Sequence, residues 1–189
     1  MSDEFVQPVS GWAGAIRRRR QGLVQRLGVG AATAMLTSTV LGWGFCAPWI
    51  LAYGVIQLIE LCIFAPINKR RLETMSPLRS ALGCVAMALN TALYCLPAIP
   101  LWLVGGPMGG LCATVMVLAS VVYSIVNSLT SVRVLVSTIA PEFVYLALMP
   151  VFMISFGASM AFATAAGGAV VVFGIYSVVA WQRMTQTAL

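Results

Sequence analysis

Residues 81–127 read ALGCVAMALNTALYCLPAIPLWLVGGPMGGLCATVMVLASVVYSIVN, and they include no charged side chain. The glycine-rich residues 105–110 (GGPMGG) divide this stretch into two apolar segments, 81–105 and 111–127. A transmembrane helix needs about 20 apolar residues, and neither segment shows the alternation of a barrel strand. The stretch therefore predicts two membrane-spanning helices joined by a short turn.

The rest of the chain has the same character. Of its 189 residues, 60% are hydrophobic and 8% are charged, and the mean hydropathy is +0.95. Soluble domains carry about 25% charged residues, so we expect an integral membrane protein. Six segments have the length of a span: 28–44, 47–67, 81–105, 111–127, 135–156 and 160–181. The predicted fold is an all-α bundle of six transmembrane helices, which leaves no room for a soluble catalytic domain.

The basic side chains predict the orientation of this bundle. With six spans, all eleven fall on one side of the membrane, and the loops on the other side are uncharged. The positive-inside rule then places both termini in the cytoplasm. Five tryptophans fall at span ends, as in an aromatic belt. The residues that define the topology are Arg17, Arg18, Arg19, Arg20, Lys69, Arg70, Arg71, Arg79, Arg133 and Arg183.

Three parts are expected along the chain. They are a cytoplasmic basic amphipathic leader (1–27), the six-helix transmembrane domain (28–181) and the start of a cytoplasmic tail or signalling helix (182–189). The first two spans are interpreted as joined by a tight turn at 42–48 (GWGFCAP).

The leader admits two interpretations. Trp12, Ile16, Leu23 and Leu27 recur at helical spacing beside four consecutive arginines. This pattern is typical of a helix on the inner leaflet, where each arginine near anionic lipid contributes about 1 kcal/mol. The alternative is a disordered basic segment that only sets the topology.

Residue types exclude most kinds of catalysis. Histidine is absent, which rules out histidine-bound haem or zinc and a histidine base. The five cysteines form no Cys-x-x-Cys pair, and the loop 105–110 has no basic residue to support a phosphate. We therefore expect no enzyme, no cofactor and no metal site. The bases are too few and too scattered for a nucleic-acid surface.

Glu60 is one of two carboxylates in or beside the spans, and an intramembrane acid is a functional candidate. Gln57 lies one helical turn before it, and either Gln57 or Asn90 could share its proton. The structural alternative is that Glu60 extends toward the basic loop at 69–71, where headgroups neutralise it.

Glu142 follows Pro141, and its depth depends on where the fifth span begins. A helix continuous from Leu135 would be kinked by the proline and would bury the carboxylate. A helix that begins at Pro141 would place Glu142 at its positive end near the interface, and the span would be short. The sequence leaves both interpretations open.

Polar groups within spans most often hydrogen-bond one helix to another. The candidate polar or sensing residues are Gln57, Glu60, Asn90, Asn127, Glu142 and Tyr145. Small residues at four-residue spacing predict close helix packing, within the chain or with a second copy. These packing residues are Gly30, Ala34, Ser38 and Gly42 in the first span and Ser159, Ala163 and Gly167 in the sixth.

Spans two to five contain the segments AYGVIQLIE (52–60), LWLVGGPMGGLCA (101–113) and APEFVYLALMP (140–150). These segments resemble parts of the six-span amino-terminal membrane regions of alphaproteobacterial sensor histidine kinases, often hybrid ones. In that family the sixth span continues into a signalling helix, a domain with the phospho-accepting histidine and an ATPase domain. The family's phosphorylation site matches no residue here.

The resemblance implies a sensory and anchoring module of a two-component kinase, without catalytic residues of its own. It implies a multi-pass protein of the bacterial inner membrane, surrounded by lipid and paired as a homodimer. One alternative is a small six-span transporter component that binds a small molecule, although its outer loops would be short for closing over a substrate. The other alternative is a helical membrane scaffold.

Overall fold

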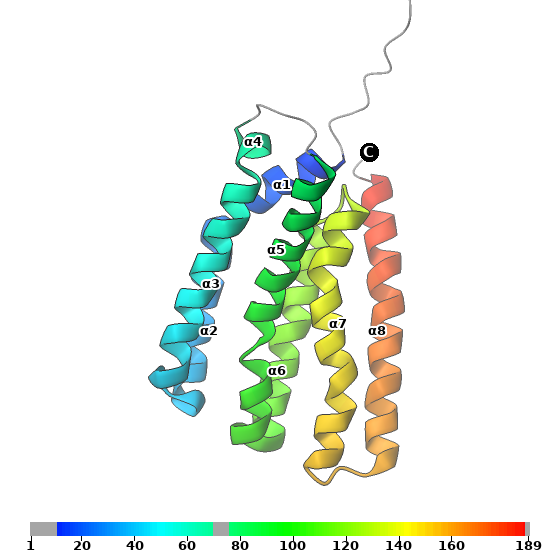
Figure 1. The fold of residues 1–189 in the computed structure, drawn as a ribbon. Coiled ribbons are helices and arrows are strands. Elements are labelled where there is room, and N and C mark those ends of the chain that lie inside the picture. The colour runs from blue at the N-terminus through cyan, green and yellow to red at the C-terminus, as the bar shows by residue number, and fades with distance from the viewer. Residues whose placement is uncertain (1–10, 70–75, 188–189) are drawn as a thin grey trace, which may run out of the picture.

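The computed structural model describes residues 11–69 and 76–187, in which every regular element is an α helix (Figure 1). In chain order the helices are α1 (Trp12–Gln21), α2 (Leu23–Leu41), α3 (Trp43–Ile63), α4 (Ala65–Asn68), α5 (Pro77–Cys95), α6 (Ala98–Asn127), α7 (Val132–Ser155) and α8 (Met160–Thr187). The long helices lie side by side, and α1 and α4 lie at one end of the bundle. The prediction of an all-α fold is confirmed.

Four helical stretches are long and apolar enough to cross a membrane: Trp43–Ile63, Pro77–Asn127, Val132–Ser155 and Met160–Thr187. The second of these has 51 residues. At about 1.5 Å per residue it would extend over roughly 76 Å, more than twice the thickness of a hydrocarbon core. This stretch therefore has the length for two passes. The chain is a membrane-embedded helical protein.

The reversal within that stretch occurs at Gly106, which has a φ of 57° and a ψ of −147°. Glycine adopts this conformation without steric cost. On either side of it the chain packs against itself, because Leu101 and Trp102 leave no room for a Cβ atom on Gly109 and Gly110. The turn predicted over 105–110 is therefore a single residue, and α6 resumes at Pro107.

The start of α7 decides the depth of Glu142. Ser131 caps this helix, because its hydroxyl accepts a hydrogen bond from the amide of Val134 at 3.5 Å. The helix then runs through Pro141 without ending, and Glu142 is 0% exposed. The first of the two interpretations holds.

Two predicted boundaries need correction. Helix α2 begins at Leu23, so residues 23–27 belong to the first long helix and not to the leader. Gly22 lies between α1 and α2, and the hydroxyl of Tyr123 is 2.6 Å from where a Cβ of this residue would be. The turn predicted at 42–48 is also shorter, since Gly42 alone (φ 75°) joins α2 to α3 and Pro48 lies inside α3.

Helix α1 is regular over Trp12–Gln21, and its apolar side chains pack against protein. Ile16 is buried, and Trp12 meets Phe64 edge-on with ring centroids 5.6 Å apart. The apolar positions Leu23 and Leu27 lie on α2, beyond the break, so the predicted stripe is divided between two helices. Residues 1–10 of the leader lie outside the described residues.

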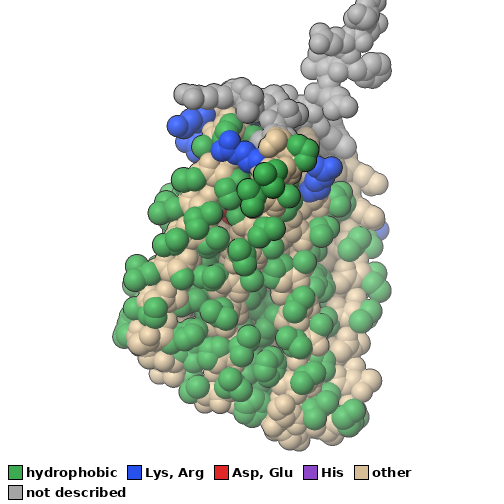
Figure 2. Space-filling model, in the orientation of Figure 1, with side chains coloured by type: hydrophobic (Ala, Val, Ile, Leu, Met, Phe, Trp, Pro, Cys, Tyr) green, Lys and Arg blue, Asp and Glu red, His purple; other side chains and the backbone are tan. Residues whose placement is uncertain are grey.

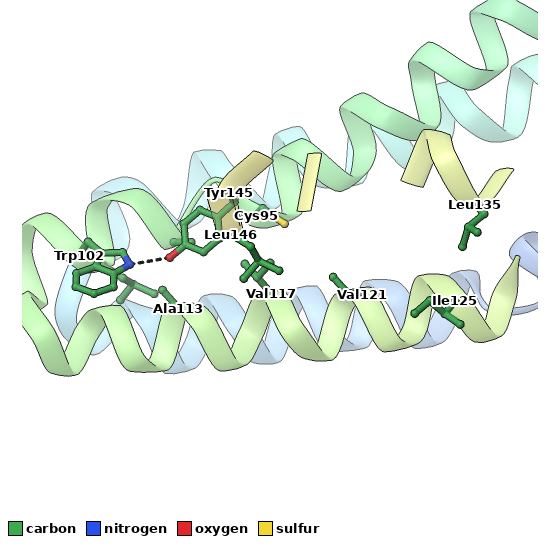
Figure 3. Packing of buried hydrophobic residues seen from close by; sticks show 11 residues of the cluster. Cys95, Trp102, Ala113, Val117, Val121, Ile125, Leu135, Tyr145 and Leu146 are labelled. Atoms are coloured by element: carbon green, nitrogen blue, oxygen red, sulfur yellow. Dashed lines mark hydrogen bonds between the residues drawn. The ribbon is translucent and has the colours of Figure 1, made fainter. Parts of the chain in front are cut away.

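The main core lies between α5, α6 and α7. From α6 it takes Ala113, Val117, Val121 and Ile125, which share one face because they are four residues apart (Figure 3). At one end of this cluster the indole Nε1 of Trp102 donates to the hydroxyl of Tyr145 at 2.8 Å. This face fixes α6 against α7.

The outer surface suits a bilayer. Hydrophobic side chains cover the flank of the bundle, and the visible Lys and Arg side chains gather at the end that holds α1 and α4 (Figure 2). Helix α8 is the least covered of the candidate spans, with 11% of its apolar window buried compared with 28–39% in the others. It therefore packs at the edge of the bundle.

Candidate functional site

Glu60, in α3, lies at the centre of a buried ion cluster. Arg19 Nε donates to Glu60 Oε1 at 2.9 Å, and Arg19 Nη2 donates to Oε2 at 3.0 Å. Arg26 Nη1 lies 3.4 Å from Oε1. The three residues are 4–8% exposed. A bidentate arginine–carboxylate pair of this kind is a strong, directional interaction, and its burial requires each charge to have a partner.

Two amides extend the cluster into α5. Asn90 Nδ2 donates to Glu60 Oε2 at 2.6 Å, and Gln57 Nε2 donates to Asn90 Oδ1 at 2.8 Å. The three candidates Gln57, Glu60 and Asn90 are thus brought together in one hydrogen-bonded chain. Asn90 contacts the carboxylate directly, and Gln57 reaches it only through Asn90.

The described residues give Glu60 other partners than the basic loop at 69–71. Lys69 is exposed, and Arg70 and Arg71 lie outside the described residues. The carboxylate pairs instead with Arg19, which was assigned only to topology, and with Arg26. Burial opposes the charge on Arg19, but the attraction of Glu60 outweighs it and raises the pKa of Arg19. No local pattern signals this pairing, because Arg19 and Arg26 lie on different helices, on either side of the break at Gly22.

A cavity of about 200 Å³ lies beside the cluster. Its wall is formed by side chains from α1, α2, α3, α5 and α6. Its polar members include Arg19, Arg26, Tyr53, Asn90, Tyr94 and Tyr123. Two buried atoms of this wall, Arg26 Nε and the Tyr123 hydroxyl, have no hydrogen-bond partner. Sequence reasoning did not find Tyr123, which no local pattern distinguishes.

Glu142 lies behind another part of the wall. The hydroxyls of Ser120 and Ser124, both cavity residues, donate to Glu142 Oε1, the second at 3.1 Å. Its other oxygen, Oε2, is buried and has no partner. Helix α7 is therefore linked to the cavity through two serines of α6.

The remaining polar candidates lie elsewhere. Asn127 Nδ2 donates to the carbonyl of Tyr123 at 2.8 Å, within the last turn of α6. Tyr145 accepts the bond from Trp102 in the main core. Asn127 thus bonds only its own helix, Tyr145 links α7 to α6, and neither residue lines the cavity.

The small-residue faces meet helices of the same chain. Gly30 lies against the ring of Tyr53, and Ala34 is buried with Trp49, so α2 packs closely on α3. Farther along, Ser38 bonds its own helix and Gly42 forms the turn. On α8, Ala163 is buried, and a Cβ on Gly167 would lie 3.6 Å from Pro150 of α7. Ser159 accepts a hydrogen bond from the amide of Phe162 in the first turn of α8.

Several topology arginines bond to backbone at the basic end. Arg17 Nε donates to the carbonyl of Ile67 at 3.5 Å, and Arg20 Nη1 donates to that of Asn68 at 2.9 Å. Arg79 Nε donates to the carbonyl of Ile63 at 2.8 Å, at the negative end of α3. Arg18, Arg133 and Arg183 are exposed.

Across residues 11–69 and 76–187, no three carboxylates or thiols converge to hold an ion, and the cysteines there are free. The described site offers guanidinium, amide and hydroxyl groups, which bind and orient polar ligands.

Comparison with known proteins adds no relative. No family model, no curated protein and no solved structure matches the chain.

Proposed function

We propose that the chain is the membrane-embedded sensory and anchoring module of a sensor histidine kinase. It has six spans in a bacterial inner membrane, its termini are cytoplasmic, and it functions as a homodimer. The observation that carries the proposal is a pair of hydrogen bonds between α8 and the turn after α6. Trp181 Nε1 donates to the carbonyl of Ser128 at 3.1 Å, and Thr185 Oγ1 shares its one proton between the carbonyls of Leu129 and Trp181, each at 2.8 Å.

These bonds connect the cavity to the end of the last helix. Helix α6 supplies Ser120, Tyr123 and Ser124 to the cavity wall and ends at Asn127, just before the bonded turn. A displacement of this half of α6 would pass to the last two turns of α8. Because α8 is otherwise little covered, it is free to shift or rotate against α7, which is a known signalling movement of helices.

The packing of α2 supports six spans. Together with α3, α5, α6, α7 and α8 it runs the length of the bundle (Figure 1). Its one charged residue, Arg26, is buried against Glu60 and is not presented to lipid. Pairing inside a bundle is how membrane proteins accommodate such a charge.

The orientation predicts a pattern of reporter activities. Alkaline phosphatase fused after Gly42 or Gly157 is expected to be active, and fused after Arg79 or Thr187 to be inactive. Green fluorescent protein at the same four positions should give the opposite pattern, because it fluoresces only when it folds in the cytoplasm. Phosphatase activity at Arg79 would contradict the proposed orientation.

A chimera tests the sensory role. The chain is fused after Leu189 to the cytoplasmic part of a histidine kinase, and autophosphorylation is measured in membrane vesicles. Removing both α8 bonds with W181F/T185V is expected to change the basal rate by about fivefold or more, since each bond contributes about 1 kcal/mol to one arrangement of α8.

The matched control for this chimera is T187V. In the wild type the Thr187 hydroxyl bonds only to carbonyls of its own helix, those of Arg183 and Met184. The T187V substitution therefore removes a threonine hydroxyl from the same segment and leaves the bonds to the α6–α7 turn intact. Equal autophosphorylation in the wild-type, T187V and W181F/T185V chimeras would refute the proposed coupling.

The cavity also favours a second candidate, a substrate-binding component of a small transporter. In that case proteoliposomes that contain the chain and its partner subunits would accumulate the bound molecule, and the W181F/T185V chimera would behave as the wild type does.

A further inference from the structure

The cavity wall presents two buried donors that lack an acceptor. Arg26 is 8% exposed, and its Nε is unpartnered although the other two guanidinium nitrogens bond to Glu60 and to the carbonyl of Arg19. The Tyr123 hydroxyl is the second donor. Buried polar groups in proteins are normally paired, so each of these two wall residues has a donor whose usual acceptor is missing.

Glu60 has no free acceptor position for either of these two donors. Its Oε1 contacts Arg19 and Arg26, and its Oε2 accepts from Arg19 and Asn90. A carboxylate has about four acceptor positions, and all of them are used here. Two guanidinium groups thus share one carboxylate, which leaves an excess positive charge at the cavity.

The second acid nearby does not fill this role. Glu142 is not part of the wall, and Ser120 and Ser124 stand between it and the cavity with their hydroxyls donating to it. The described residues therefore place cationic and phenolic donors on the cavity surface and keep both carboxylates behind them.

The size of the cavity limits the occupant. An apolar cavity of about 150 Å³ is known to accept benzene, and this one is about 200 Å³. It is too small for a phospholipid headgroup together with its glycerol and chains. Tyr53, Tyr94 and Thr91 offer an aromatic and partly apolar lining for the body of a small molecule.

An entrance lies between α2 and α6. The lining residues Gln25, Val29 and Ala119 are exposed, with Val29 at 45%. A small, partly apolar molecule could thus enter from the side of the bundle.

We propose that this cavity binds a small organic carboxylate, of about the size of benzoate. Arg26 Nε and the Tyr123 hydroxyl donate to its two oxygens, and its body packs on the tyrosine rings. Gly22 is a positioning residue for this contact, since any larger side chain there would push the Tyr123 hydroxyl aside. The binding site itself does not depend on the proposed function. Only the role of the bound carboxylate as the stimulus of the sensory module rests on it.

The test measures benzoate binding calorimetrically to the full chain in nanodiscs of zwitterionic lipid. Saturable binding is expected, and Y123F should weaken it by about tenfold or more, because a hydrogen bond to a charged group is lost. Y123F should not reduce thermal stability, since the hydroxyl has no partner to lose. R26K keeps the charge but removes the Nε donor, and it should weaken binding as well.

The matched control is Y145F, which removes a tyrosine hydroxyl outside the cavity and should leave the benzoate affinity unchanged. The proposal is overturned if benzoate does not bind, if Y123F binds it as the wild type does, or if neutral benzamide binds equally well. It is also overturned if phosphatidylglycerol in the nanodisc abolishes benzoate binding, which would assign the site to lipid. Benzoate binding with an unresponsive W181F/T185V chimera would support the site and refute the sensory role alone.

Discussion

Replacing Glu60 with glutamine is expected to lower the free energy of unfolding by about 3–5 kcal/mol. The substitution keeps the shape of the side chain but leaves Arg19 and Arg26 buried without a counter-charge. Removing one partner of a buried ion pair destabilises a protein more than replacing both partners with apolar residues, because the remaining buried charge keeps its desolvation penalty. The measurement is reversible unfolding in mixed detergent and sodium dodecyl sulfate micelles.

The second buried acid provides the control for this experiment. In Glu142→Gln the new amide oxygen still accepts from Ser120 and Ser124, and the two serines donate from neutral hydroxyls. We expect a change of about 1 kcal/mol or less. If E60Q and E142Q have equal effects, the Arg19–Glu60–Arg26 cluster does not carry the stability assigned to it. The apolar variant R19M/R26L/E60L should recover most of the loss.

Replacing Gly109 with alanine is expected to destabilise the fold by about 3 kcal/mol. The new methyl group would overlap the carbonyl oxygen of Leu101, which is backbone and cannot turn aside. The chain reverses at Gly106 only if these two segments approach closely, so relief of the overlap requires the whole reversal to open. The same unfolding measurement gives the change in free energy.

Gly168→Ala is the matched control, because its added methyl group meets nothing within 4 Å on α8. Alanine is also the better helix former, so this variant should be as stable as the wild type or up to about 1 kcal/mol more stable. A G109A variant as stable as G168A would show that the two segments around Gly106 do not pack as described.

Part of the candidate site could be predicted from the sequence. Glu60, Gln57 and Asn90 were singled out because polar groups within apolar helices are rare and costly, and they do meet in space. The role of these residues in sensing stays a prediction. Arg19 and Arg26 were assigned to the cytoplasmic surface, since a basic residue at the end of a span ordinarily faces headgroups.

The pairing of those arginines depends on contacts between distant segments. Arg19 and Glu60 are 41 residues apart, and the path of α1 across the bundle end brings them together. That path depends in turn on the break at Gly22, where Tyr123 of α6 occupies the space of a side chain. No pattern within residues 12–27 contains this information, so the sequence left open whether this segment is a helix on lipid or a disordered basic segment.

Glu142 is a second example of a feature that the local sequence leaves open and the folded bundle selects. Its neighbourhood in the sequence is compatible with two helix starts, because proline is accepted both in a first turn and at a kink. The cap at Ser131 and the two serines of α6 favour the longer helix, and these contacts exist only in the folded bundle.

The all-α membrane class and the approximate position of the reversal near 105–110 follow from the amino-acid sequence. The reason is that a bilayer offers backbone groups no partner, so a long uncharged apolar run has to be helical. Which charges are buried, where α1 lies and which residues line the cavity become clear only in the folded bundle. Those outcomes depend on packing between helices that are far apart in the chain, whereas composition and periodicity report only on one helix and its solvent.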